Sequence, residues 1–86
     1  MADYQVLVAR SASREIEALP AAVRNKVIAR IELLEHQPRP VGVKKLQGAA
    51  DLWRLRVGNY RVVYAINDSA KVVDILAVRH RREVYR

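Results

Sequence analysis

The feature that most constrains the fold is a β-hairpin predicted in the second half of the chain. Residues 52–57 alternate strictly between apolar side chains and arginines, which is the pattern of a strand with one buried face. Gly58-Asn59 is a two-residue turn signal, and residues 60–66 follow as the returning strand. On the first strand, Arg54 and Arg56 therefore project from the face opposite the apolar one.

The N-terminal half predicts one strand and two helices. Residues 4–8 alternate around two valines and indicate a strand. Ser11 or Ser13 can cap the helix that follows, and Pro20 separates this helix from a second one. Apolar residues then repeat at three- and four-residue steps to about Glu35, which is typical of an amphipathic helix. We expect the two helices to form a hairpin.

The C-terminal part completes the expected sheet. A second turn at residues 67–70 leads into residues 72–78, which are apolar on both faces and predict a strand in the sheet centre. A short basic tail follows. The expected fold class is α+β, with an N-terminal strand and a helical hairpin packed on an antiparallel sheet. The 86 residues suffice for one domain, residues 1–86, but not for two.

Composition excludes several kinds of functional site. The chain has no cysteine, which rules out a disulfide framework, a zinc–thiolate site and a cysteine nucleophile. Its two histidines, His36 and His80, are too far apart in sequence to form a metal-ligand spacing. Neither a signal peptide nor an apolar stretch of membrane-spanning length is evident. We expect a cytoplasmic protein that needs no metal or other cofactor.

The positive charge is concentrated in the second half of the chain. The net charge is +7, and residues 1–40 hold six Lys or Arg against five Asp or Glu. Residues 41–86 hold ten against four. This asymmetry is the expected footprint of a protein that binds a polyanion such as RNA. The alternative is that a small domain is basic only for solubility.

Five residues are expected to gather on one surface. Arg54 and Arg56 share a strand face, and Arg61 begins the neighbouring strand just after the turn, close to Arg56. Arg81 and Tyr85 follow the last strand and are expected to fold back over the same surface. Phosphate is the main partner for such a concentration of guanidinium groups, because like charges repel without an anion between them. For the two strand arginines alone, a solvated face is an equally good interpretation.

Other side chains have a functional and a structural interpretation. Tyr85 is suited to stacking on an unpaired base, or to packing the C-terminal segment on the sheet. His80 can transfer protons near neutral pH, although a histidine between arginines is often only a surface residue. Core packing is the better interpretation for the other aromatic residues of the strands. Further basic residues are candidates for contact with the RNA backbone: Lys44 and Lys45, which are expected to precede the sheet, and Arg79 and Arg82.

Three segments together resemble the RelE/ParE toxin superfamily. Residues 45–48 read K-L-Q-G and residues 56–64 read R-V-G-N-Y-R-V-V-Y, similar to the family's K-L-x-G and R-x-G-x-Y-R-[VL]-[VL]-Y. Residues 78–85, V-R-H-R-R-E-V-Y, resemble its V-x-H-R-x-x-[VI]-Y ending. The similarity covers almost the whole chain, and the combination of motifs is specific.

The resemblance implies a toxin that cleaves messenger RNA in the ribosomal A site and is silenced in a hetero-oligomer with a cognate antitoxin. Such an endoribonuclease uses the 2′-hydroxyl of the RNA to attack the adjacent phosphate and needs no metal. Basic side chains then move protons and stabilise the phosphate charge. Arg61 and Arg81 match the family's phosphate-stabilising arginines. Tyr85 matches the tyrosine that stacks on a base and orients the nucleophile.

One departure from the family concerns proton transfer. Arg54 and Arg56 stand where the best-known RelE enzymes have lysines, and arginine effectively never loses its proton. Either His80 is the general base, or catalysis rests on charge stabilisation and on positioning of the substrate by the ribosome. Two other functions are considered: a ParE-type toxin that poisons DNA gyrase, and a non-catalytic RNA-binding module.

Overall fold

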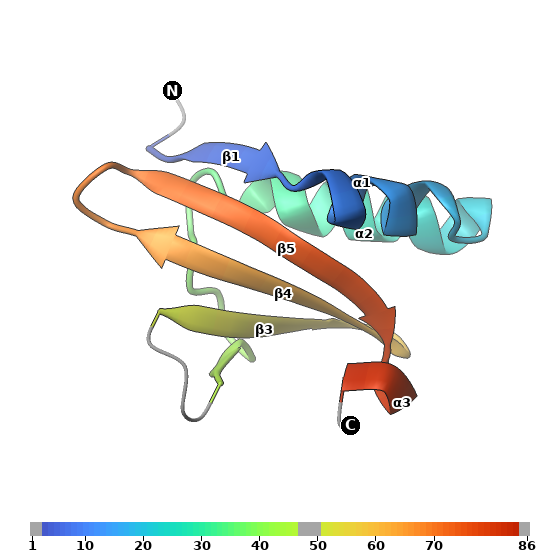
Figure 1. Ribbon diagram of the computed structural model, residues 1–86. Coiled ribbons are helices and arrows are strands. Elements are labelled where there is room, and N and C mark those ends of the chain that lie inside the picture. The colour runs from blue at the N-terminus through green and yellow to red at the C-terminus, as the bar shows by residue number, and fades with distance from the viewer. Residues whose placement is uncertain (1–2, 47–50, 85–86) are drawn as a thin grey trace.

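The structure is a computed structural model that describes residues 3–46 and 51–84. Two helices lie side by side against a twisted sheet, and a short third helix follows the last strand (Figure 1). Within the described residues, no helix is long and apolar enough to cross a membrane. The elements, in chain order, are β1 (Gln5–Val8), α1 (Arg10–Glu17), α2 (Ala21–Leu33), β2 (Lys44–Lys45), β3 (Leu52–Val57), β4 (Tyr60–Asn67), β5 (Val72–His80) and α3 (Arg81–Val84).

The sheet is mixed rather than wholly antiparallel. Its strand order is β1-β5-β4-β3-β2, and β3, β4 and β5 form the expected antiparallel meander. β1 pairs with β5 in parallel, which adds a strand to the expected antiparallel sheet and makes it mixed. Two strands joined by a tight turn must be antiparallel. The helical hairpin that follows β1 is a long connection, which allows β1 to pair in parallel. β5 is an inner strand, as its apolar sequence predicts, while β4 occupies the centre.

Two local expectations are corrected. The first helix begins at Arg10, its N-cap is Ala9, and no side chain caps it, so neither Ser11 nor Ser13 has that role. The Ala9 backbone N–H donates to the Ile75 carbonyl at 2.9 Å, so the chain passes directly from the sheet into the helix. Lys44 and Lys45 do not precede the sheet but form its edge strand, β2.

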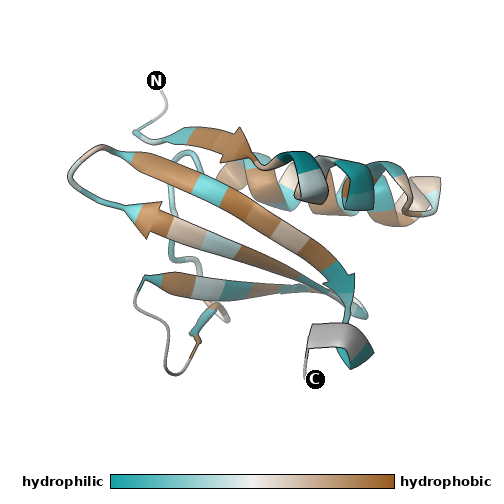
Figure 2. Cartoon of the chain, viewed as in Figure 1, coloured by the Kyte–Doolittle hydropathy of each residue, from teal (hydrophilic) through white to brown (hydrophobic). Residues whose placement is uncertain are grey.

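The core lies between the two helices and one face of the sheet, and apolar residues predominate along β4 and β5 in Figure 2. In β3, Leu55 and Val57 are buried and Arg56 is exposed, which confirms the predicted alternation. The Gly58-Asn59 turn is also confirmed: Gly58 has φ +59°, a conformation that glycine adopts without strain. The buried apolar residues are Ala12, Ile16, Leu19, Val27, Ile31, Leu34, Leu55, Val57, Val62, Tyr64, Ile66, Val73, Ile75 and Val78.

Polar contacts fix the segment between α2 and β2 to the end of the sheet. The buried Tyr64 hydroxyl donates to the Pro38 carbonyl at 2.7 Å. Burial raises the pKa of Tyr64 to about 12, so the hydroxyl keeps its proton as a donor. The adjacent Arg39 guanidinium makes two hydrogen bonds to Asp68, at 3.2 and 2.9 Å, and lies 5.0 Å from the centroid of the Trp53 ring. These contacts of Pro38 and Arg39 with the sheet therefore fix the path of the chain into β2.

The Asp68 carboxylate provides a test of these contacts. Hydrogen bonds from Arg39 and from the Tyr4 hydroxyl hold the pKa of Asp68 below its usual range. Because the folded-state pKa is the lower one, the stabilisation is present above the unfolded-state pKa and is lost as the pH falls through the folded-state pKa. We expect the difference in unfolding free energy between the native protein and Asp68→Asn to shrink below about pH 4.

Urea denaturation at a series of pH values measures this difference. Asp3→Asn is the control for loss of one exposed carboxylate, because Asp3 forms no salt bridge with the described residues. A difference for Asp68→Asn that stays constant from neutral pH to well below pH 4 would contradict the assignment.

Candidate functional site

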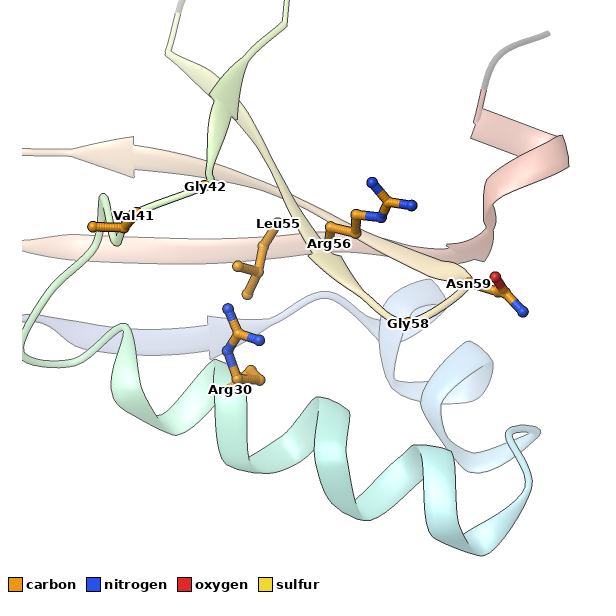
Figure 3. Close-up of a pocket in the computed structure, with 7 residues that line it drawn as sticks. All are labelled: Arg30, Val41, Gly42, Leu55, Arg56, Gly58 and Asn59. Atoms are coloured by element: carbon orange, nitrogen blue, oxygen red, sulfur yellow. The ribbon is translucent and has the colours of Figure 1, made fainter.

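Four basic side chains share the sheet face opposite α1 and α2. Arg54 of β3 pairs with Lys44 of β2, and Arg56 of β3 pairs with Arg61 of β4. Directly opposed residues on antiparallel strands project from the same face, and so do alternate residues of one strand. The register therefore brings all four together, as expected for the three arginines. In Figure 3 the Arg56 side chain points away from α2, toward the side on which α3 lies.

These four side chains and Gly42 line a pocket of about 140 Å³. This volume is below the range of about 300–1,000 Å³ found for small-molecule sites, so the pocket suits a small group. Among the described residues, no carboxylate lines it. The four positive charges and the size of the pocket fit a phosphate group. The pocket is too small for a whole nucleotide.

Arg61 is the most enclosed of these cations. It is only 5% exposed, and its Nη1 donates to the Tyr60 carbonyl at 3.3 Å. The effective dielectric constant is lower in such surroundings than at an open surface, so the charge attracts an anion more strongly. The planar guanidinium also presents its donors in a fork that matches phosphate oxygens. Arg61 is thus placed to hold a phosphate, while Arg56 lies beside it and is exposed.

Arg79 is engaged elsewhere. It is opposite Arg61 in the β4–β5 register, but its Nε donates to Glu15 Oε2 at 3.0 Å. The other oxygen of Glu15 accepts from the Val78 backbone N–H at 2.9 Å, beyond the point where β1 ends its pairing with β5. Glu15 was not singled out from the sequence, because its partners lie more than 60 residues away and no local pattern indicates them.

His80 lies on the other side of the sheet from Arg61. It is opposite Tyr60 in the register, and the two rings meet edge to face with centroids 5.4 Å apart. Tyr60 packs against the core, so the His80 ring is on the helix side. Its Nδ1 accepts from the Arg82 backbone N–H at 3.4 Å. This position favours the alternative in which catalysis does not depend on proton transfer by His80.

The C-terminal residues begin beside the hairpin turn. The Arg81 backbone N–H donates to the Asn59 carbonyl at 2.7 Å, which holds the start of α3 next to the β3–β4 turn (Figure 1). Arg81 and Arg82 are exposed and do not line the pocket. Lys45 shares the face of Trp53, opposite that of Lys44. Tyr85 lies outside the described residues.

A second, larger hollow adjoins the pocket. It has a volume of about 630 Å³ and shares Gly42 and Arg56 with the smaller one (Figure 3). Arg30 of α2 contributes to the wall of this hollow. The sequence pattern of the helix does not distinguish Arg30 from the other basic residues of α2. The described residues contain no group of three or more His, Cys, Asp or Glu side chains that could hold a metal ion.

Known proteins share both the sequence pattern and the fold. Residues 6–85 match the family described as ParE toxin of type II toxin-antitoxin system, parDE. The chain is 32% identical to Toxin RelG of Mycobacterium tuberculosis, over 96% of this chain and 97% of that protein. It is 30% identical to Toxin RelE of the same organism, over 96% of this chain and 87% of that protein.

Solved structures agree with the sequence comparisons. In the archaeal RelE–RelB complex from Pyrococcus horikoshii OT3, a chain superimposes with a TM-score of 0.82 and 33% identity, over 92% of this chain and 96% of that one. A chain of the toxin–antitoxin complex RelBE2 from M. tuberculosis superimposes with a TM-score of 0.81 and 32% identity, over 92% of this chain and 99% of that one. The match to the family extends over nearly the entire sequence and is supported by relatives above 30% identity. The chain belongs to the RelE/ParE superfamily of toxins from type II toxin–antitoxin systems.

Proposed function

We propose that this toxin is a metal-independent endoribonuclease of the RelE type, which cleaves messenger RNA in the ribosomal A site. The observation that carries the proposal is the phosphate-sized pocket in which Arg61 is buried beside Arg56, Arg54 and Lys44. The proteins named RelG and RelE among its relatives support the RelE type, whereas the matching family is named for ParE toxins.

In the proposed reaction, the 2′-hydroxyl oxygen bonds to the adjacent phosphorus and the bond from phosphorus to the 5′-oxygen breaks. The products are a 2′,3′-cyclic phosphate and a 5′-hydroxyl end. Arg61 and Arg56 stabilise the additional negative charge on the phosphate oxygens as the 2′-oxygen attacks. Arginine cannot accept the 2′-hydroxyl proton, which passes to water, and the proton on the 5′-oxygen also comes from water.

The remaining parts of the proposal follow from family resemblance. Arg81 adds charge from the start of α3, and Tyr85 stacks on a base next to the scissile phosphate. The ribosome holds the RNA in the bent form that the attack requires. Solved relatives are complexes of RelE with RelB, which supports a cognate antitoxin as the partner of this chain. We place an acidic segment of that antitoxin across the basic face, where it would compete with RNA.

Phosphate binding can be tested separately from cleavage. Ligands that bind only the folded state raise the melting temperature, so inorganic phosphate should raise the Tm of the native chain. Lys44→Gln removes one charge from the pocket and should weaken phosphate binding roughly threefold, the size expected for one exposed ion pair. Lys45→Gln, the same change on the opposite face, should retain the native rise. Equal rises in all three proteins would show that phosphate does not occupy this pocket.

Cleavage tests the function itself. We expect Arg61→Ala and Arg56→Gln each to lower the cleavage rate by about 100-fold, the usual loss for removal of one donor to a developing oxyanion. Primer extension on messenger RNA in a translation system, with and without ribosomes, measures the rate. Circular dichroism shows whether each variant is folded. Arg56→Gln should remain folded because Arg56 is exposed, so it tests the pocket even where Arg61→Ala unfolds. Arg14→Gln in α1 is the control for loss of one surface charge.

Full activity in a folded Arg56→Gln or Arg61→Ala variant would reject the phosphate clamp. Gyrase-trapped DNA breaks without transcript cleavage would identify a ParE-type toxin instead. RNA binding with steep salt dependence and no scission would identify a binding module.

A further inference from the structure

The larger hollow next to the phosphate pocket carries an inference that deepens the proposed function and rests on it. We propose that this groove is the subsite for the ribonucleotide that flanks the scissile phosphate, and that Arg30 binds the outer phosphate of that nucleotide. The groove is lined by Arg30, Val41, Gly42, Leu55, Arg56, Gly58 and Asn59.

The groove exists because β2 covers only part of the edge of β3. β2 pairs with Arg54 and Trp53, and no other strand of the described residues pairs with β3 on that side toward the hairpin turn. Gly42 has φ +93°, a conformation that L-residues with a side chain rarely adopt, and it carries the chain away from the line of the strand. The space along this edge is continuous with the phosphate pocket through Gly42 and Arg56.

Positive charge stands at both sides of the groove. In Figure 3 the Arg30 side chain extends from α2 toward Leu55, while Arg56 leaves β3 in the opposite direction. An RNA strand whose scissile phosphate lies in the smaller pocket can therefore pass round the edge of β3 and meet a second guanidinium on the helix side. The charged residues that the structure describes in the lining are Arg30 and Arg56, so a polyanion fits this part of the groove better than a peptide of mixed charge.

The size and chemistry of the lining suit a nucleoside. About 630 Å³ lies within the range of about 300–1,000 Å³ found for small-molecule sites, in contrast to the phosphate-sized pocket. Val41 is 95% exposed and offers apolar contact to a base or sugar. The residues that the structure describes in the lining include no aromatic ring on which a base could stack. We therefore expect charge and apolar contact to hold the flanking nucleotide, with little preference among the four bases.

The test uses RNA that cannot be cleaved. A 2′-O-methyl dinucleoside monophosphate offers one phosphate, whereas a 2′-O-methyl tetranucleotide also supplies flanking nucleotides with their phosphates. Each is titrated into the ¹⁵N-labelled full chain and followed by NMR. The native chain should bind the tetranucleotide about tenfold more tightly, the effect of one additional charge-assisted hydrogen bond. The backbone amides of Gly58 and Asn59 should shift further with the tetranucleotide.

Arg30→Gln should lose the tenfold gain and bind the dinucleoside as the native chain does. Glutamine is nearly as good a helix former as arginine, so α2 should be preserved. Lys26→Gln is the matched control, because Lys26 lies one turn earlier on α2, is exposed and does not line the groove. It should keep the gain.

Three results would overturn the subsite. The first is equal affinity of the native chain for both compounds. The second is an equal loss of affinity for the tetranucleotide in Arg30→Gln and Lys26→Gln. The third is a tighter binding of the tetranucleotide that survives Arg30→Gln. Failure of the proposed function is distinguishable, because it would appear as absence of transcript cleavage by the native chain, or as dinucleoside binding that Arg61→Ala does not weaken. If Arg61→Ala abolishes dinucleoside binding while Arg30→Gln leaves the gain intact, the phosphate pocket stands and the groove assignment falls.

Discussion

The register between β3 and its two neighbours places like charges directly opposite one another, Arg54 beside Lys44 and Arg56 beside Arg61. Such cross-strand pairs are destabilising by a few tenths of a kcal/mol to about 1 kcal/mol each. The apolar residues on the other face of the same strands fix this register, because a slip of one residue would bury the arginines and expose Leu55 and Val57. An anion bound between the basic side chains would relieve the repulsion, so the packing of the core and the proposed phosphate binding depend on one alignment.

The two ends of the basic face are held by contacts outside it. At one end, the Tyr64 hydroxyl and the Arg39–Asp68 ion pair fix the segment that leads to Gly42 and β2. At the other end, the backbone hydrogen bond from Arg81 to Asn59 fixes the start of α3 against the hairpin turn. These contacts join segments that are distant in sequence, and they give the pocket a shape that exists before any ligand binds. Less ordering is then needed on binding, which favours affinity.

The local features of the fold were predictable, whereas the long-range contacts were not. Alternation in β3 and the Gly58-Asn59 signal predict the hairpin, and the hairpin alone brings Arg56 next to Arg61. Nothing in the local pattern indicates that β1 is parallel to β5, that Glu15 engages Arg79, or that Arg30 reaches the edge of β3. Each of these depends on how the helical hairpin lies on the sheet. His80 was grouped with the arginines by closeness in sequence, although adjacent residues of a strand face opposite sides.

Membership of the RelE/ParE superfamily establishes what kind of protein this is, and the basic pocket is the basis for assigning its chemistry. The most direct test is a crystal structure of the full chain with a 2′-O-methyl RNA oligonucleotide. The account predicts one phosphate within hydrogen-bonding distance of the guanidinium groups of both Arg56 and Arg61, on the face opposite α1 and α2. RNA bound elsewhere on the molecule, with that pocket empty, would contradict it.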